Sequence, residues 1–152
     1  MLYICIAGTI FAGDFFIKDC MEKRLKEGEI ISKLGGAVRL RKYHNRGAFL
    51  NAGEKRRQTV ALLSVLLTAV LTGVFVITLG TRGNTLLKTG LSLLLGGAFS
   101  NTYDRLKKKY VMDYFSFGGR WSGLSRVVFN LSDFGIIIGA LIVAVSASSR
   151  LS

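Results

Sequence analysis

The stretch TVALLSVLLTAVLTGVFVITLG, residues 59–80, runs for 22 residues without a charged side chain. An α-helix needs about 20 predominantly apolar residues to cross the hydrocarbon core of a bilayer. Backbone polar groups find no water there, so only a helix or a closed barrel can span that core. This stretch therefore predicts a transmembrane helix and a membrane protein.

Three further apolar segments carry one charge each: residues 1–17 with Asp14, residues 84–103 with Lys88, and residues 127–149 with Asp133. Half of the 152 residues are hydrophobic and the mean hydropathy is +0.42, which is too apolar for an ordinary soluble domain. We predict an all-α membrane protein with one domain, residues 1–152, built as a bundle of four transmembrane helices.

The first apolar segment has a rival interpretation as a cleaved signal peptide. A signal peptide begins with a basic region, which an apolar stretch follows. Residues 1–17 have no basic residue, and Asp14 interrupts their apolar part. An uncleaved first helix is the favoured interpretation.

The first loop, residues 18–58, is strongly charged but holds the run IISKLGGAVRLRKY, residues 30–43. In this run Gly35 and Gly36 separate two partly alternating segments, a pattern typical of a β-hairpin. We therefore predict a small β-like extramembrane element in the first loop.

The net charge of +12 admits two partner classes, nucleic acid and anionic lipid. The basic residues cluster in loops beside apolar spans, and no RNA- or DNA-binding motif accompanies them. Membrane lipids are therefore the predicted partner, and nucleic acid is not. The single His44 and the two cysteines, Cys5 and Cys20, match no metal-binding or redox spacing, so we expect no cofactor.

Polar side chains recur at one end of three predicted helices. They are Asp14 and Lys18 in the first helix, Asn101, Asp104 and Arg105 in the third, and Asn130 and Asp133 in the fourth. Helices of alternating direction bring these three ends to the same membrane face. A charge at the centre of a span costs about 2.5–3.5 kcal/mol on insertion scales, so such residues are candidates for function.

Asp113 lies in VMDYFSF, residues 111–117, where alternate side chains of an extended segment fall on one side. Such a segment directs Asp113 towards the mouth of the bundle. If Asp113 and Asp133 lie within a few ångströms, like-charge repulsion and desolvation keep one of them protonated. One carboxylic acid beside one carboxylate is the working arrangement of aspartic peptidases.

Five blocks of sequence follow one another in a recognisable order: DFFIK (14–18), NRGAF (45–49), GGAFSNTYDR (96–105), VMDYFSF (111–117) and FNLSD (129–133). Together they resemble the lipoprotein signal peptidase family, also called signal peptidase II, over most of the chain. The resemblance implies a four-helix aspartic endopeptidase of the bacterial cytoplasmic membrane. Such enzymes cleave prolipoproteins just before a diacylglyceryl-modified cysteine and release the signal peptide.

The resemblance also implies roles for particular residues. Asp113 and Asp133 would form the catalytic dyad. The residues expected to bind substrate or support the site are Asn45, Gly47, Asn101, Arg105 and Asn130. A structural role is expected for Asp14, Lys18 and Asp104. For Arg105, pairing with a neighbouring carboxylate and binding of a substrate carbonyl both stay open.

The sequence departs from the family pattern at three places. Ser100 stands where the family usually has glycine, and Ser132 stands where it usually has alanine. The block that ends at Phe49 is one residue shorter than usual. These departures keep open a catalytically silent relative that binds lipidated peptides. A small transporter or channel subunit is also possible, although it would require ionisable residues through the depth of the bundle.

Loop charges and the resemblance disagree about orientation. Residues 18–58 hold 12 Lys and Arg residues and residues 104–126 hold six, so the positive-inside rule places both loops in the cytoplasm. The resemblance implies cytoplasmic termini and an active face on the outer side. A long loop that folds as a unit is a poorer guide to orientation, so we favour the second arrangement. We expect the protein to be a monomer.

Overall fold

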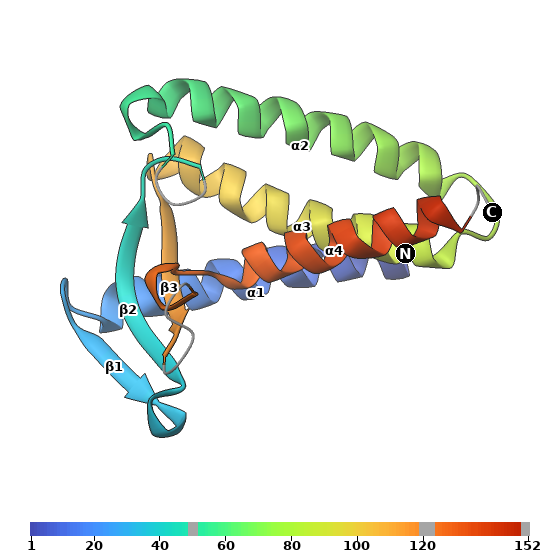
Figure 1. Cartoon of the computed structure of the whole chain (residues 1–152). Coiled ribbons are helices and arrows are strands. Elements are labelled where there is room, and N and C mark those ends of the chain that lie inside the picture. Colours follow the sequence, from blue (N-terminus) through green and yellow to red (C-terminus); the bar gives the residue numbers. More distant parts are fainter. Residues whose placement is uncertain (49–51, 119–123, 150–152) are drawn as a thin grey trace.

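The computed structural model describes residues 1–48, 52–118 and 124–149. Within these ranges the helices and strands are α1 (Leu2–Arg24), β1 (Ile30–Lys33), η1 (Leu34–Gly36), β2 (Val38–Asn45), η3 (Glu54–Arg56), α2 (Arg57–Leu79), α3 (Thr85–Lys107), β3 (Val111–Phe117), η4 (Leu124–Arg126) and α4 (Leu131–Ser148). The four long helices form a bundle, and the strands gather at one end of it (Figure 1). The start of α1 and the end of α4 lie at the opposite end (Figure 1).

Among the described residues, two helices are long and apolar enough to cross a membrane: Glu54–Leu79, which includes α2, and α4. Helices α1 and α3 bury ionisable side chains, among them Asp14 and Asp104, which make these two helices less apolar. The predicted mostly helical fold is confirmed, and the four transmembrane spans stay a prediction.

The predicted hairpin in the first loop is present, because β1 pairs with β2 in antiparallel register. Gly35 and Gly36 make its turn with φ angles of 62° and 90°, a left-handed region that glycine enters without steric cost. Confining the β element to the first loop was wrong. Strand β3, from the third loop, pairs with β2 to complete a sheet of order β1-β2-β3.

Three helix boundaries differ by four residues or more from the sequence prediction. Helix α3 continues past residue 103 to Lys107. Helix α1 continues past residue 17 to Arg24, because its last turns carry charged side chains beyond the apolar segment. Helix α4 begins at Leu131 rather than at residue 127. The backbone N–H of Phe129 donates to Phe115 at 2.6 Å, which ties the preceding residues to β3 instead of the helix.

Gly96 and Gly97 allow two helices to approach α3 closely. A Cβ atom at Gly96 would lie 2.6 Å from the carbonyl oxygen of Ala7 in α1. A Cβ atom at Gly97 would collide with the carbonyl oxygen of Ser132 in α4. Small residues permit such backbone approach between helices in membranes. Helix α3 is therefore the central helix against which α1 and α4 position their polar ends.

We predict that Gly97→Ala destabilises the protein by about 1–3 kcal/mol or more, because its methyl group overlaps the backbone of α4. Thermal unfolding in detergent measures the effect. Gly73→Ala is the matched control, since its position in α2 is exposed and no atom lies within 4 Å of the added methyl group. Equal unfolding midpoints for the two variants would contradict this role of Gly97.

Candidate active site

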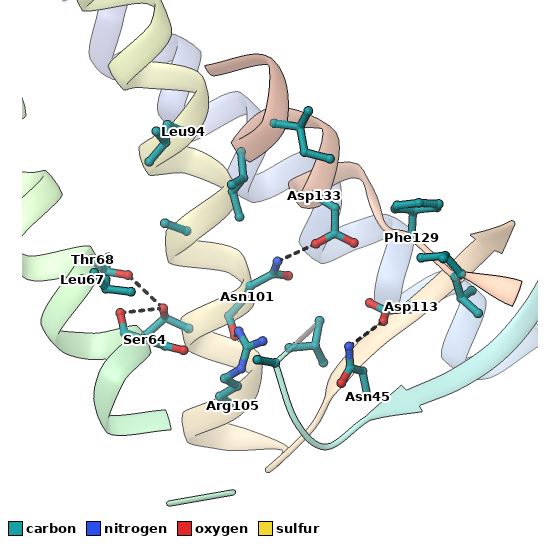
Figure 2. Close-up of a pocket in the computed structure, with 18 of the residues that line it drawn as sticks. Asn45, Ser64, Leu67, Thr68, Leu94, Asn101, Arg105, Asp113, Phe129 and Asp133 are labelled. Carbon is teal, nitrogen blue, oxygen red and sulfur yellow. Dashed lines mark hydrogen bonds between the residues drawn. The ribbon is translucent and has the colours of Figure 1, made fainter. Parts of the chain in front are cut away.

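Asp113 lies within β3, opposite Tyr43 of β2, and its side chain points into the bundle (Figure 2). It is only 2% exposed. Asn45 Nδ2 donates to Asp113 Oδ2 at 3.2 Å, and Asn130 Nδ2 donates to Asp113 Oδ1 at 2.7 Å. The alternation of β3 thus delivers a buried carboxylate that two side-chain amides hold in place.

Asp133 lies in the first turn of α4, where Asn130 is the N-cap. The backbone N–H of Asp133 donates to Asn130 Oδ1 at 2.9 Å, and the backbone N–H of Asn130 donates to Asp133 Oδ2 at 3.0 Å. This reciprocal capping box satisfies N–H groups that the helix cannot pair itself. The positive end of the helix dipole favours a negative charge at the same place. The capping box therefore fixes the position of Asp133 at the start of α4.

Two asparagines connect the carboxylates. Asn101 Nδ2 donates to Asp133 Oδ1 at 3.0 Å (Figure 2), and Asn130 Nδ2 donates to Asn101 Oδ1 at 3.3 Å. Since Asn130 also donates to Asp113, a chain of amide groups runs from one aspartate to the other. The two carboxylates are thereby held in one hydrogen-bonded unit.

Asp113 and Asp133 line a shared pocket of about 370 Å³ among α2, α3, α4 and the strands (Figure 2). Burial, and then the neighbouring carboxylate of Asp133, raise the pKa of Asp113 from 3.8 to about 7, against the opposing effect of the two amides. A carboxyl group with this pKa is protonated in a large share of the molecules near neutral pH. The pair can therefore supply one acid and one base to a reaction in the pocket.

The pocket is lined by both polar and apolar side chains. Its described lining includes Arg105 and Arg126 as well as the two aspartates. The apolar part of the lining consists mainly of Leu67, Leu71, Leu94, Ala98, Ile136 and Ile137. A ligand with a long apolar part and a polar reacting group matches this distribution.

The comparisons with known proteins agree with this geometry. The family model for signal peptidase (SPase) II matches residues 6–148. This chain belongs to the signal peptidase II family. Within the described residues, no group of three His, Cys, Asp or Glu side chains is placed to hold a metal ion.

Several curated relatives are lipoprotein signal peptidases. The one from Halothermothrix orenii is 30% identical over 140 residues, covering 92% of this chain and 90% of its own. The one from Caldicellulosiruptor bescii is 32% identical over 144 residues, covering 93% and 87%. A bacterial membrane enzyme solved by the in meso method at 2.3 Å resolution has a TM-score of 0.84 at 20% identity, covering 99% of this chain and 90% of its own. A second such structure, at 1.9 Å resolution, has a TM-score of 0.77 at 20% identity, covering 96% of this chain and 92% of its own. These two structures support the fold.

The residues expected to support a signal peptidase II site do gather around the dyad. Arg105 donates to the carbonyl oxygens of Asn101 and Gly47, both at 3.3 Å, and the N–H of Gly47 donates to Asn45 Oδ1 at 3.1 Å. In this structure Arg105 holds these two backbone carbonyls, and both roles left open for it stay predictions. It therefore ties the segment after β2 to α3. Phe49 lies outside the described residues.

The residues for which a structural role was expected, Asp14, Lys18 and Asp104, form a buried cluster in contact with Asn101. Lys18 Nζ lies 2.7 Å from Asp14 Oδ2 and 3.1 Å from Asp104 Oδ2, and it donates to Asn101 Oδ1 at 2.9 Å. Asp14 and Lys18 are thus an ion pair between residues four apart on α1. Its contact with the asparagine that holds Asp133 was not anticipated.

Some pocket residues were missed by the sequence reasoning. Thr68 of α2 shares a hydrogen bond of 2.9 Å with Thr102 of α3, and Ser64 lies one turn before Thr68 (Figure 2). Their spacing of four residues within an otherwise apolar helix was an available signal of a shared face. Arg126 was visible only as a basic residue before an apolar segment.

We predict that Asn130→Ala lowers stability by about 1 kcal/mol, because the N-cap of α4 is lost, and lowers peptidase turnover far more, because Asp113 loses a donor. Thermal unfolding and turnover of a lipopeptide substrate measure the two effects. Asn130→Ser separates them, since serine caps a helix but is too short to reproduce the amide contact. If Asn130→Ser restores turnover along with stability, the amide has no role in supporting the dyad.

Proposed function

We propose that this chain is an aspartic endopeptidase that cleaves prolipoproteins just before the diacylglyceryl-modified cysteine, with Asp113 and Asp133 as its catalytic dyad. The observation that carries the proposal is the amide-linked pair of carboxylates in one pocket of a signal peptidase II chain. The names of the curated relatives support the substrate class.

Asp133 is the general base in this proposal, and Asp113 is the general acid. The carboxylate of Asp133 accepts a backbone N–H and an amide at the N-terminal end of α4, where the helix dipole favours a negative charge. The donors described for Asp113 are side-chain amides, and its raised pKa keeps the proton there. The difference in surroundings separates the two roles.

The reaction then follows from these protonation states. Asp133 takes a proton from water as the water oxygen attacks the scissile carbonyl carbon, while Asp113 donates its proton to the carbonyl oxygen. The tetrahedral intermediate collapses when the proton on Asp133 passes to the leaving amide nitrogen. One hydroxyl proton of the intermediate returns to Asp113, so both aspartates regain their starting states.

The apolar lining of the pocket is the proposed site for the lipid and signal-peptide parts of the substrate. It is contributed by three helices, with Leu67 and Leu71 from α2, Leu94 from α3 and Ile137 from α4. Binding energy from groups remote from the scissile bond holds that bond against the dyad. Lipids of the surrounding bilayer are the other proposed partner, and we propose that the protein acts as a monomer.

We propose four membrane spans, with both termini in the cytoplasm and the sheet at the outer face of the bacterial cytoplasmic membrane. The position of the start of α1 and the end of α4, opposite the sheet, supports an even number of crossings (Figure 1). The first loop folds into β1 and β2, which weakens the inference from its basic residues.

A catalytically silent relative is less well supported than an active enzyme. The departures Ser100 and Ser132 both hydrogen-bond Asp14 rather than a dyad carboxylate. Asn101, Asn130 and the two aspartates keep their mutual contacts beside them.

We predict that Asp113→Asn and Asp133→Asn each lower cleavage of a diacylglyceryl-modified prolipoprotein by at least about 100-fold, because an amide can neither take nor give the proton. Asp19→Asn is the matched control, since Asp19 pairs with Lys23 on the exposed side of α1. Gel-based cleavage kinetics with purified enzyme in detergent decide the outcome. Near-wild-type turnover in either dyad variant contradicts the mechanism.

We predict a bell-shaped dependence of kcat/KM on pH. The pKa of Asp113 is about 7, so activity falls on the alkaline side near that pH as the dyad loses its shared proton. It falls on the acid side as the second carboxylate becomes protonated. Activity that still rises between pH 7 and pH 9 would show that no carboxyl proton is needed.

A further inference from the structure

The carboxylate of Asp14 is completely buried and receives donors from every element around it. Its Oδ1 atom accepts the backbone N–H of Leu131 at 3.1 Å and the hydroxyl of Tyr114 at 3.4 Å. Its Oδ2 atom accepts the ammonium of Lys18 at 2.7 Å. Two serine hydroxyls complete the set on this second oxygen.

Those two hydroxyls come from the helices that carry the site. Ser100 of α3 donates to Asp14 Oδ2 at 2.7 Å, and Ser132 of α4 donates to the same oxygen at 2.5 Å. Both serines are buried, at 3% and 0% exposure. The contacts join residues 86 and 118 positions apart in the chain, so they depend on the assembled bundle.

Each serine directly precedes a residue of the amide-linked unit. Ser100 is followed by Asn101, which holds Asp133, and Ser132 is followed by Asp133 itself. A displacement of either serine therefore moves one end of the Asn101–Asp133 hydrogen bond.

Lys18 adds an electrostatic link between Asp14 and Asn101 to the steric link through the serines. Its ammonium lies near four acceptors: Asp14 at 2.7 Å, Asn101 at 2.9 Å, Asp104 at 3.1 Å and Ser100 at 3.2 Å. An ammonium has only three protons to donate. While the two serines share the charge of Asp14, Lys18 is free to hold Asn101 as well. The family usually has glycine and alanine at these two positions, so the two hydroxyls are an addition in this chain. Of the donors described for Asp14 Oδ2, only Lys18 would remain without them.

We propose that Ser100 and Ser132 are positioning residues of the peptidase: together they clamp Asp14, leave Lys18 to orient Asn101, and so fix Asp133 in the dyad. The inference rests on the proposed function. The hydroxyls touch neither substrate nor dyad carboxylates in this arrangement and act through Asp14 and Lys18. Removing one hydroxyl leaves Asp14 with the other serine as a donor. Removing both hydroxyls leaves Asp14 without a serine donor.

The test is a double-mutant cycle of Ser100→Ala, Ser132→Ala and the double variant in the full-length enzyme, with kcat, KM and thermal midpoint measured on one lipopeptide substrate. We expect kcat to fall about threefold in each single variant and about 30-fold or more in the double variant, which exceeds the product of the single effects. KM should stay within about twofold, because the apolar lining of the pocket is untouched.

Ser92→Ala is the matched control. Ser92 is a buried serine of the same helix α3, and its hydroxyl donates to the carbonyl of Lys88 within that helix. We expect this variant to keep the wild-type kcat. If Ser92→Ala loses as much kcat as Ser100→Ala, the loss follows from removing any buried hydroxyl of this helix. That result would overturn the proposal.

Unchanged kcat in both single variants, with or without a lower thermal midpoint, would also overturn it, because the hydroxyls would then only stabilise the bundle. The single variants alone decide this point if the double variant does not fold. A wild-type chain without turnover contradicts the proposed function, and this inference falls with it. Wild-type turnover with unaffected serine variants contradicts the inference alone.

Discussion

The buried ammonium of Lys18 is the interaction on which the bundle and the site both depend. It lies between the carboxylates of Asp14 and Asp104, and all three side chains are almost fully removed from solvent. Transferring such charges out of water costs several kcal/mol per ion unless each is paired and hydrogen-bonded. Lys108 contacts the other oxygen of Asp104 at 3.0 Å and balances the second negative charge. Helices α1 and α3 must therefore meet with these side chains in register.

The need to pair these buried charges also explains why the polar side chains at one end of the helices could be predicted from sequence. Asp14 and Lys18 are four residues apart, a spacing that places them on one helix face whatever the rest of the chain does. The alternation of residues 111–117 likewise directs Asp113 to the buried side, and β3 forms over that range. Local periodicity was sufficient for these features because each depends on neighbours in the chain.

The start of α4 could not be predicted from hydropathy, for a physical reason. Asn130 and Asp133 are three residues apart, and the apolar segment that begins at residue 127 places both of them inside the predicted helix. The pairing of Phe129 with Phe115 instead makes Asn130 the N-cap. This backbone contact between segments distant in the sequence determines where α4 begins. The hydropathy of the sequence does not indicate such a contact.

The partners of Arg105, Ser100 and Ser132 were beyond sequence reasoning for a related reason. Apart from the bond of Arg105 to Asn101 within α3, these contacts join different elements. A serine in an apolar helix, moreover, commonly bonds its own backbone, as Ser64 does to Val60. Nothing in the sequence distinguishes Ser92, which does the same, from Ser100, which reaches another helix. Only the close approach allowed by Gly96 and Gly97 places Ser100 and Ser132 beside Asp14.

The placement of Asn101 between Lys18 and Asp133 has an electrostatic consequence. An ammonium in direct contact with Asp133 would neutralise its charge and weaken the repulsion that keeps a proton on Asp113. The amide accepts from Lys18 with its oxygen and donates to Asp133 with its nitrogen, so it transmits position without transferring a full charge. The cation therefore orders the site while the dyad keeps its shared proton. A site that needs both a buried ion pair and two coupled carboxylates requires a neutral, two-sided residue between them, and asparagine meets that requirement.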